Sequence, residues 1–461
     1  MESLRLVLSI FSALFIGWNI LYIISLKNTR LSFLEKLFVS YGLGFGFISL
    51  EMFIFHFFSL KFSLFSIMVW WIPLIAAVLL VASKRRKSHR PGGKGAVTKK
   101  TPLSVLERFL ICGISFEVIY AFFRALIKPI EAYDAIATYA IRSKIFYLAG
   151  SLPHDFFYNL SLLFPHPDYP LNIPLSETFV YLFLGGLNDQ LVKVIFPIYF
   201  VAILGILYYA VKRLSGRAGA LLFTFILATI PQFNHFATNA YHDVPFAYYC
   251  FTGTLFLLYW FKEPGSRGYL YISAVMTALA GWTKNEGFVY CVANIILLSV
   301  FLFLNRRTIK KRGLLNGFLY VGIMLLVLAP WLWVKFTANL VNSDVGSTSL
   351  EQLNIFKQSY KIWPIFYEFQ RQIFGPKKWN LIWIIFILSA IVYRKKLFDE
   401  SRRYATISLI LIVSGYIFAY LIGRDDIWHM VGTTWSRMAM HFLPLAVYWL
   451  ALLFGKFEPD I

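Results

Sequence analysis

The sequence predicts an all-α polytopic membrane protein of about 13 transmembrane helices in a bundle. Hydrophobic residues make up 59% of the 461 residues and charged residues only 15%, a balance far from that of soluble domains. Apolar runs of roughly 20 residues recur along the chain, and each can cross a bilayer as a helix. Most of the 44 Lys and Arg residues fall on one side of these runs, which makes that side cytoplasmic. The net charge of +21 therefore reflects topology, and nucleic acid binding is not expected.

The apolar runs fall into two groups. Three runs form an N-terminal membrane unit over residues 1–83, and the first is too long for a signal peptide, so we interpret it as a retained helix. A basic, glycine-containing stretch over residues 84–107 predicts a cytoplasmic linker. Ten more runs form a membrane domain over residues 108–461. The approximate centres of all the runs are Phe15, Phe47, Ile72, Glu117, Tyr199, Ile226, Thr252, Met276, Ile296, Met324, Phe386, Val413 and Ala446.

The first long external loop, residues 128–190, begins with polar residues at the mouth of a span. Asp134 opens a stretch whose apolar residues recur at helical spacing as far as Gly150, which predicts a helix lying in the membrane interface. A carboxylate in the first turn suits the positive end of such a helix. The loop continues with a proline-bounded segment, HPDYPL at 166–171, and a second amphipathic stretch over about 175–187.

A later external loop, residues 335–380, contains another predicted surface helix. Its apolar residues recur at helical spacing over 349–363, and Pro364 is expected to interrupt the helix. Such a helix either covers a site as a lid or seals the bundle, and the sequence leaves both interpretations open. A third external loop, residues 424–438, carries Arg437.

Two short external turns place charges at the ends of membrane helices. Asp243 opens one span, and Lys284 and Glu286 close another. Ionisable groups at membrane depth are costly and usually face a cavity or a partner. Because Lys284 and Glu286 are two positions apart, we expect the helix to break there and the two charges to meet different partners. The alternative for each charge alone is an interfacial ion pair with only a structural role.

The segments that carry these charges resemble the GT-C class of membrane glycosyltransferases, and more narrowly the bacterial group that includes lipid A aminoarabinose transferase and the protein O-mannosyltransferases. The resemblance covers roughly 109–455, in the family's order. It implies an inverting transfer of a sugar from a polyprenyl-phosphate carrier to a glycan, lipid or protein acceptor on the extracytoplasmic face. The resembling segments are EAYD at 131–134, HPDYPL at 166–171, DVP at 243–245, WTKNEG at 282–287, and Arg437 ahead of the Leu-Pro pair at 443–444.

The chemistry of such a transfer agrees with the residue types at the external helix ends. A neutral hydroxyl is a poor nucleophile, so the acceptor needs a base, and Asp134 is the candidate. Many members of the group have a second carboxylate next in sequence, where this chain has Ala135. Negative charge accumulates on the departing phosphate, and the candidate cations are Arg437, Lys284 and Arg142. The residues given supporting or substrate-binding roles are Glu131, His166, Asp168, Tyr169, Asp243 and Glu286.

Two other functions fit parts of the pattern. A flippase or transporter for a lipid-linked or polar substrate agrees with the number of spans and with intramembrane charges such as Glu51 and Glu117, although a transporter usually binds its substrate near mid-membrane. An O-antigen ligase or polymerase also uses polyprenyl carriers, as diphosphates. The predicted location is the bacterial cytoplasmic membrane, surrounded by membrane lipids, with the site facing outside the cytoplasm.

No cofactor is predicted, and a divalent metal is the less favoured alternative. The histidines at 429 and 441 fit interfacial hydrogen bonding better than metal ligation. The four candidates for metal ligands follow no ligand spacing, and they are His154, His166, Asp168 and His242.

Overall fold

Helices account for every regular element in the part of the chain that the computed structural model describes, and that part contains no strand. The described residues are 1–25, 29–87, 102–158, 167–341, 354, 356–423 and 426–455, with the backbone alone at 82–87 and 308–312. The prediction of an all-α bundle is confirmed.

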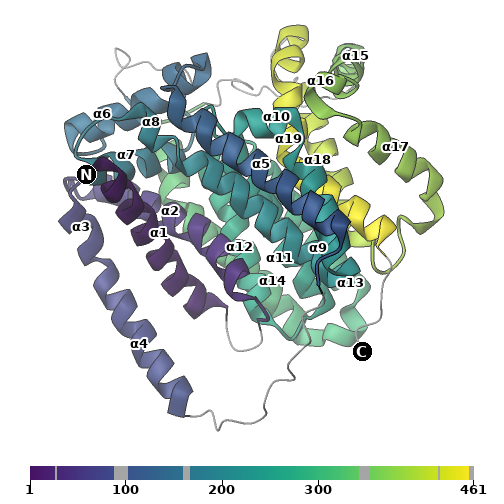
Figure 1. Cartoon of the computed structure of the whole chain (residues 1–461), viewed down its shortest axis with the longest axis horizontal. Coiled ribbons are helices and arrows are strands. Elements are labelled where there is room, and N and C mark those ends of the chain that lie inside the picture. The colour runs from purple at the N-terminus through teal and green to yellow at the C-terminus, as the bar shows by residue number, and fades with distance from the viewer. Residues whose placement is uncertain are drawn as a thin grey trace.

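The longer helices and the short apolar helix α17 form the bundle (Figure 1). They are α1 (Glu2–Ile24), α2 (Phe33–Phe57), α4 (Trp71–Lys87), α5 (Val105–Ile127), α9 (Ile195–Ala228), α11 (Asp243–Lys262), α12 (Arg267–Thr283), α13 (Gly287–Leu304), α14 (Arg306–Thr337), α17 (Ile382–Val392), α18 (Arg403–Ile422) and α19 (Ile427–Phe454). The shorter elements are α3 (Leu64–Val69), the π-helix η1 (Ala135–Ala140), α6 (Ile141–Ala149), α7 (Asn172–Leu184), α8 (Asp189–Val192), α10 (Pro231–Phe236), the 3-10 turn η3 (Ser359–Lys361), α15 (Ile362–Ile373), α16 (Pro376–Trp379) and the 3-10 turn η4 (Arg394–Lys396).

Ten segments in the described part are long and apolar enough to cross a membrane, so the predicted count of thirteen is not confirmed. Two of the predicted spans lie within α9, whose backbone leaves the helical conformation at Ser215 and Gly216. Helix α12 has 17 residues and α17 has 11, and neither is among the ten. The repeated apolar helices nevertheless make the chain an integral membrane protein.

The first two helices pack closely against each other and against the rest of the bundle. A Cβ atom on Gly17 would overlap the carbonyl of Ser40, and one on Gly44 would overlap the carbonyl of Ala13. Small residues allow membrane helices this close approach. On its other side α2 reaches the later helices, because the Trp282 indole donates to Ser49 at 2.9 Å. Helix α4, in contrast, lies at the edge of the bundle, and only 11% of the residues in the apolar segment Leu64–Val81, which α3 and α4 share, are buried (Figure 1).

We expect Gly44→Leu to separate α1 from α2, because the added side chain has no space beside the Ala13 backbone. The predicted loss is about 3 kcal/mol of unfolding free energy, within the range for overpacked cores. Thermal unfolding of the purified protein in detergent measures it. Gly322→Leu is the matched control, since a Cβ atom there meets nothing within 4 Å. Equal unfolding temperatures for the two variants would contradict this account of the helix pair.

Charged side chains form ion pairs where α2 and α5 begin, at one end of the bundle. Glu35 pairs with Arg213 at 2.5 Å, and Glu107 pairs with Arg217 at 2.7 Å. Helices α6, α7, α15 and α16 lie at the opposite end of the bundle (Figure 1). The candidate site residues on short turns belong to that opposite end.

The connection between α5 and α9 contains one helix that agrees with its prediction and another that differs from it. The stretch from Asp134 to Gly150 is helical, with η1 followed by α6, and Gly150 ends it with a left-handed φ of 62°. The second predicted stretch, 175–187, corresponds to α7, which begins earlier and ends at Leu184. The stretch predicted as amphipathic is buried on nearly every side, because α7 packs against α1, α2 and α6.

The connection between α14 and α17 differs from the structure predicted for the loop over 335–380. Of the helix expected over 349–363, residues 349–353 and 355 lie outside the described part, and in the rest a turn and the 3-10 turn η3 precede α15. Helix α15 begins at Ile362 and continues through Pro364 to Ile373, so the expected interruption at that proline is wrong. A proline in the first turn of a helix removes an N–H that has no intrahelical partner in any case. Residues 88–101 of the predicted linker also lie outside the described part.

Candidate active site

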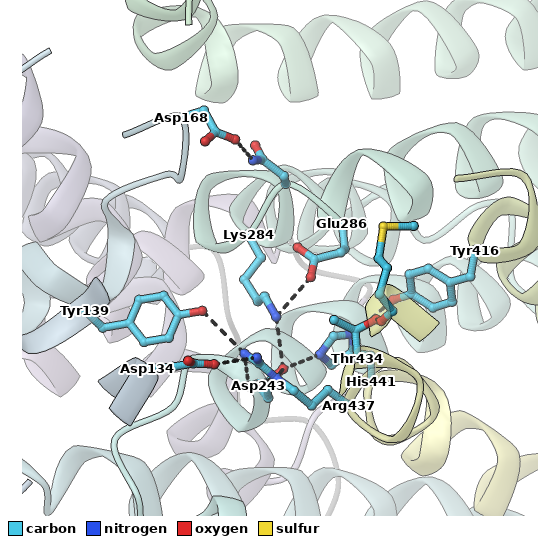
Figure 2. Close-up of polar contacts among 12 residues, drawn as sticks. Asp134, Tyr139, Asp168, Asp243, Lys284, Glu286, Tyr416, Thr434, Arg437 and His441 are labelled. Atoms are coloured by element: carbon cyan, nitrogen blue, oxygen red, sulfur yellow. Dashed lines mark hydrogen bonds and ion pairs between the residues drawn. The ribbon is translucent and has the colours of Figure 1, made fainter. Parts of the chain in front are cut away.

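Arg437, in α19, joins two carboxylates that come from distant parts of the chain (Figure 2). Its Nη1 donates to Oδ2 of Asp134 at 2.9 Å, and its Nη2 donates to Oδ2 of Asp243 at 3.0 Å. The same Nη2 lies 3.4 Å from the Tyr139 hydroxyl, and the guanidinium lies 5.0 Å from the ring centre of Tyr241. Arg437 is therefore held on several sides at the point where the first loop, α11 and α19 meet.

Asp243 is the buried centre of this arrangement. The side chain is completely buried at the first position of α11. Besides Arg437, it contacts Nζ of Lys284 at 2.9 Å and Nε2 of His441 at 2.7 Å. An unpaired buried charge is strongly destabilising, and these partners supply the compensation that Asp243 needs. The carboxylate thus positions two cations and one imidazole.

The turn between α12 and α13 supplies Lys284 and Glu286. The helix does break there, as predicted, but the two side chains also contact each other at 3.0 Å, so the expectation of different partners is wrong. Lys284 is extended (φ −149°, ψ 153°) and Glu286 is helical, and this change of conformation lets residues two apart meet.

The protonation states of this pair follow from opposing effects. Burial lowers the pKa of the Lys284 ammonium, but the carboxylates of Asp243 and Glu286 outweigh burial and raise it above its usual value. Burial raises the pKa of the Glu286 carboxyl, while Lys284 outweighs it, so the net direction is downward. Both groups are therefore charged near neutral pH.

Asp134 is the carboxylate that solvent reaches. Its side chain is 42% exposed, whereas that of Asp243 is fully buried. It lies directly before η1, where the chain turns from α5 into the first loop. Glu131 takes no part in this pairing, because it forms an exposed ion pair with Lys128 at 3.0 Å. The site thus has one accessible carboxylate, that of Asp134, beside a cluster of buried charged groups.

A second group of predicted residues lies beside the first. Asn285 stands between Lys284 and Glu286 in sequence and donates to Oδ2 of the buried Asp168 at 2.6 Å (Figure 2). Arg142 is buried, and its Nη1 donates to the Tyr169 carbonyl at 3.4 Å. Burial lowers the pKa of this guanidinium to about 10. Arg142 therefore belongs with the 168–169 segment.

Aromatic rings connect the two groups. Tyr139 stacks on His242 with ring centres 3.7 Å apart, and it faces Tyr169 at 6.4 Å. The His242 ring is buried, and burial lowers its pKa well below the usual value. Its role here is that of a neutral stacking partner.

The predicted metal candidates are separated in this structure. His154 lies near His56, with ring centres 5.7 Å apart, while His242 packs on Tyr139. His166 lies outside the described residues. Among the residues that the structure does describe, no group of three His, Cys, Asp or Glu side chains is arranged to hold a metal ion.

The sequence interpretation missed His441 as a member of the site. The ring is buried, with Nε2 against Asp243 and Nδ1 3.1 Å from the Tyr416 hydroxyl. One signal was present: His441 follows Arg437 by four positions, so both side chains lie on the same face of one helix. Tyr416 carries no comparable sequence signal.

Comparison with known proteins finds a similarity in sequence to a family model and a similarity in fold to solved structures. A family model described as dolichyl-phosphate-mannose-protein mannosyltransferase matches residues 168–333, which contain Asp243, Lys284 and Glu286. None of the curated proteins compared with the chain matches it.

The fold is similar to that of ArnT from Cupriavidus metallidurans bound to undecaprenyl phosphate. The TM-score is 0.51 at 16% identity, over 75% of this chain and 59% of that chain. The apo state of ArnT aligns with a TM-score of 0.42 at 16% identity, over 76% of each chain. This chain thus spans 59% of the length of the bound ArnT structure. The match to the bound structure confirms the predicted GT-C-like fold, and the family model over 168–333 agrees with the GT-C resemblance.

Proposed function

We propose that this chain is a glycosyltransferase that moves a sugar from a polyprenyl-phosphate carrier to an acceptor hydroxyl, with inversion at the anomeric carbon. One observation carries the proposal: the accessible carboxylate of Asp134 lies 2.9 Å from the guanidinium of Arg437, at the edge of a buried charged cluster. A base and a phosphate-binding cation are the two groups that this reaction requires.

Asp134 acts as the base. Its exposure allows an acceptor hydroxyl to approach, and the Arg437 guanidinium lies beside it at 2.9 Å. Removing the hydroxyl proton as the oxygen attacks the anomeric carbon makes the acceptor a competent nucleophile. Attack from the side opposite the phosphate gives the inverted product.

Arg437 and Lys284 stabilise the phosphate as it leaves. Arg437 keeps Nε and Nη2 on the buried Asp243, while Nη1 faces the accessible Asp134. When the phosphate of the donor binds Nη1 of Arg437, it displaces the carboxylate of Asp134. The donor is then held by Arg437, and Asp134 is free to contact the acceptor. Guanidinium groups suit such recognition because they present several donors in a fixed plane.

The lipid part of the donor explains why the site sits at the end of a membrane bundle. ArnT, which shares the fold, is described as bound to undecaprenyl phosphate, and a carrier of this kind would keep its chain among the helices. The positive-inside pattern of the loops supports an extracytoplasmic position for the site. We assign the protein to the bacterial cytoplasmic membrane on the same grounds.

The proposal is tested with the purified chain in lipid nanodiscs. We expect it to consume sugars linked to undecaprenyl monophosphate, with water or an added lipid or glycan extract as acceptor, and to leave sugars on undecaprenyl diphosphate unchanged. Mass spectrometry of the released carrier measures both reactions, and NMR of the product sugar reports its anomeric configuration. EDTA should leave the rate unchanged.

Two results would contradict the proposal. Consumption of diphosphate donors alone would favour a ligase or polymerase. Movement of a lipid-linked sugar across sealed proteoliposomes, without any covalent change, would favour a transporter.

A further inference from the structure

The side chain of Gln372, on α15, contacts both ends of one step of the α19 hydrogen-bond ladder. In a regular helix the N–H of residue 436 donates to the carbonyl of residue 432. Here the N–H of Ser436 donates to Oε1 of Gln372 at 3.0 Å, and Nε2 of Gln372 donates to the carbonyl of Gly432 at 3.0 Å. The same Nε2 lies 3.0 Å from the Val431 carbonyl. One amide from another helix thus holds α19 at the residue directly before Arg437.

The amide itself is held firmly. Gln372 is only 5% exposed, and Oε2 of the buried Glu368, one turn earlier, accepts from its Nε2 at 3.2 Å. The Trp379 indole donates to the Gln372 carbonyl at 3.0 Å. Phe369 packs on Trp435 with ring centres 4.3 Å apart. These contacts fix the orientation of α15 against the first part of α19.

The opposite face of α15 is aromatic and accessible. Trp363, Phe366 and Tyr367 are 65%, 52% and 47% exposed. Aromatic side chains on an amphipathic helix of a membrane protein suit the boundary between lipid and water. Helix α15 therefore has one face for the membrane interface and one that fixes the backbone next to Arg437 (Figure 1).

We infer that Gln372 is a positioning residue for Arg437: by holding the Gly432–Ser436 step of α19, it sets where the guanidinium stands between Asp134 and Asp243 and hence how well it receives the donor phosphate. A side chain inserted at a ladder step changes the local path of a helix. Displacement of a catalytic group by about 1 Å can reduce a rate on the order of a hundredfold. This inference rests on the proposed function, because it assigns Gln372 to the same phosphate site.

The test is a double-mutant cycle of Gln372→Met and Arg437→Ala in nanodiscs. Methionine keeps the length and packing of the side chain but makes none of the amide hydrogen bonds. We expect Gln372→Met alone to raise the KM for the monophosphate donor about tenfold while the acceptor KM stays the same. Added to Arg437→Ala, it should change the donor KM less than twofold, because its effect passes through Arg437.

Gln370→Met is the matched control, since Gln370 lies on the exposed side of the same helix and should leave both KM values unchanged. Retention of undecaprenyl phosphate, followed by native mass spectrometry, gives a second readout that needs no turnover. If Gln372→Met does not fold, Gln372→Glu enters the same cycle, because it keeps the size and the acceptor for Ser436 but loses the donor to Gly432.

The outcomes separate the two proposals. Additive effects of the two substitutions, or equal effects on donor and acceptor KM, would overturn the positioning role of Gln372 while leaving the transferase function in place. A wild-type protein that transfers no sugar yet retains undecaprenyl phosphate through Arg437 would overturn the transferase function. The positioning role of Gln372 would then be tested by comparing how much undecaprenyl phosphate the variants retain.

Discussion

Replacing Asp134 with asparagine is expected to lower the rate of sugar transfer by about three orders of magnitude. Asparagine has the same shape, and its oxygen can still accept a hydrogen bond from Arg437, but it cannot take the proton of an acceptor hydroxyl. The donor should still bind, because the Arg437–Asp243 contacts remain in place. Turnover with an undecaprenyl-monophosphate sugar measures the first effect, and lipid retention measures the second.

Glu131→Gln is the matched control for this experiment. Glu131 is also an exposed carboxylate of the same segment, but it pairs with Lys128 and takes no part in the Arg437 pairing. We expect wild-type turnover. A strong loss in Glu131→Gln together with normal turnover in Asp134→Asn would move the role of the base to Glu131.

Replacing Asp243 with asparagine is expected to destabilise the protein by about 3–5 kcal/mol, the usual range for breaking a buried ion pair. The carboxylate is fully buried between Lys284, Arg437 and His441. A neutral amide would leave Lys284 with only Glu286, and Arg437 with only Asp134, as its carboxylate partner. Thermal unfolding in detergent measures the loss. Turnover should also fall, because Arg437 and Lys284 lose the group that positions them.

Asp399→Asn is the control for stability. Asp399 pairs with Arg402 at 3.2 Å, and its side chain is 49% exposed, so the expected loss is at most about 1 kcal/mol. Similar unfolding temperatures for the Asp243 and Asp399 variants would show that Asp243 is not the structural centre of the cluster. It would then become a candidate for direct contact with substrate.

Much of the helix pattern could be predicted because membrane helices depend on local composition. A run of about 20 apolar residues satisfies its own backbone hydrogen bonds and needs no partner to be placed in lipid. Helix lengths were less predictable, as α9 and α17 show, because interruptions and short helices depend on neighbouring elements. The environment of α7 was misjudged for the same reason: helical spacing does not show how many neighbours surround a helix.

The candidate site, like the fold, has features that the sequence predicts and features that depend on long-range packing. The amino-acid sequence is enough to predict which ionisable residue types stand at the ends of the membrane helices, among them Asp134, Asp243, Lys284 and Arg437, because charges are excluded from apolar runs. The packing of the helices makes Asp243 the buried centre and Asp134 the accessible carboxylate, and it brings His441 to them, none of which the sequence shows. Asp134 and Arg437 are 303 positions apart, and their contact depends on how the first loop packs against α11 and α19. Such long-range packing leaves no periodic signal in the chain.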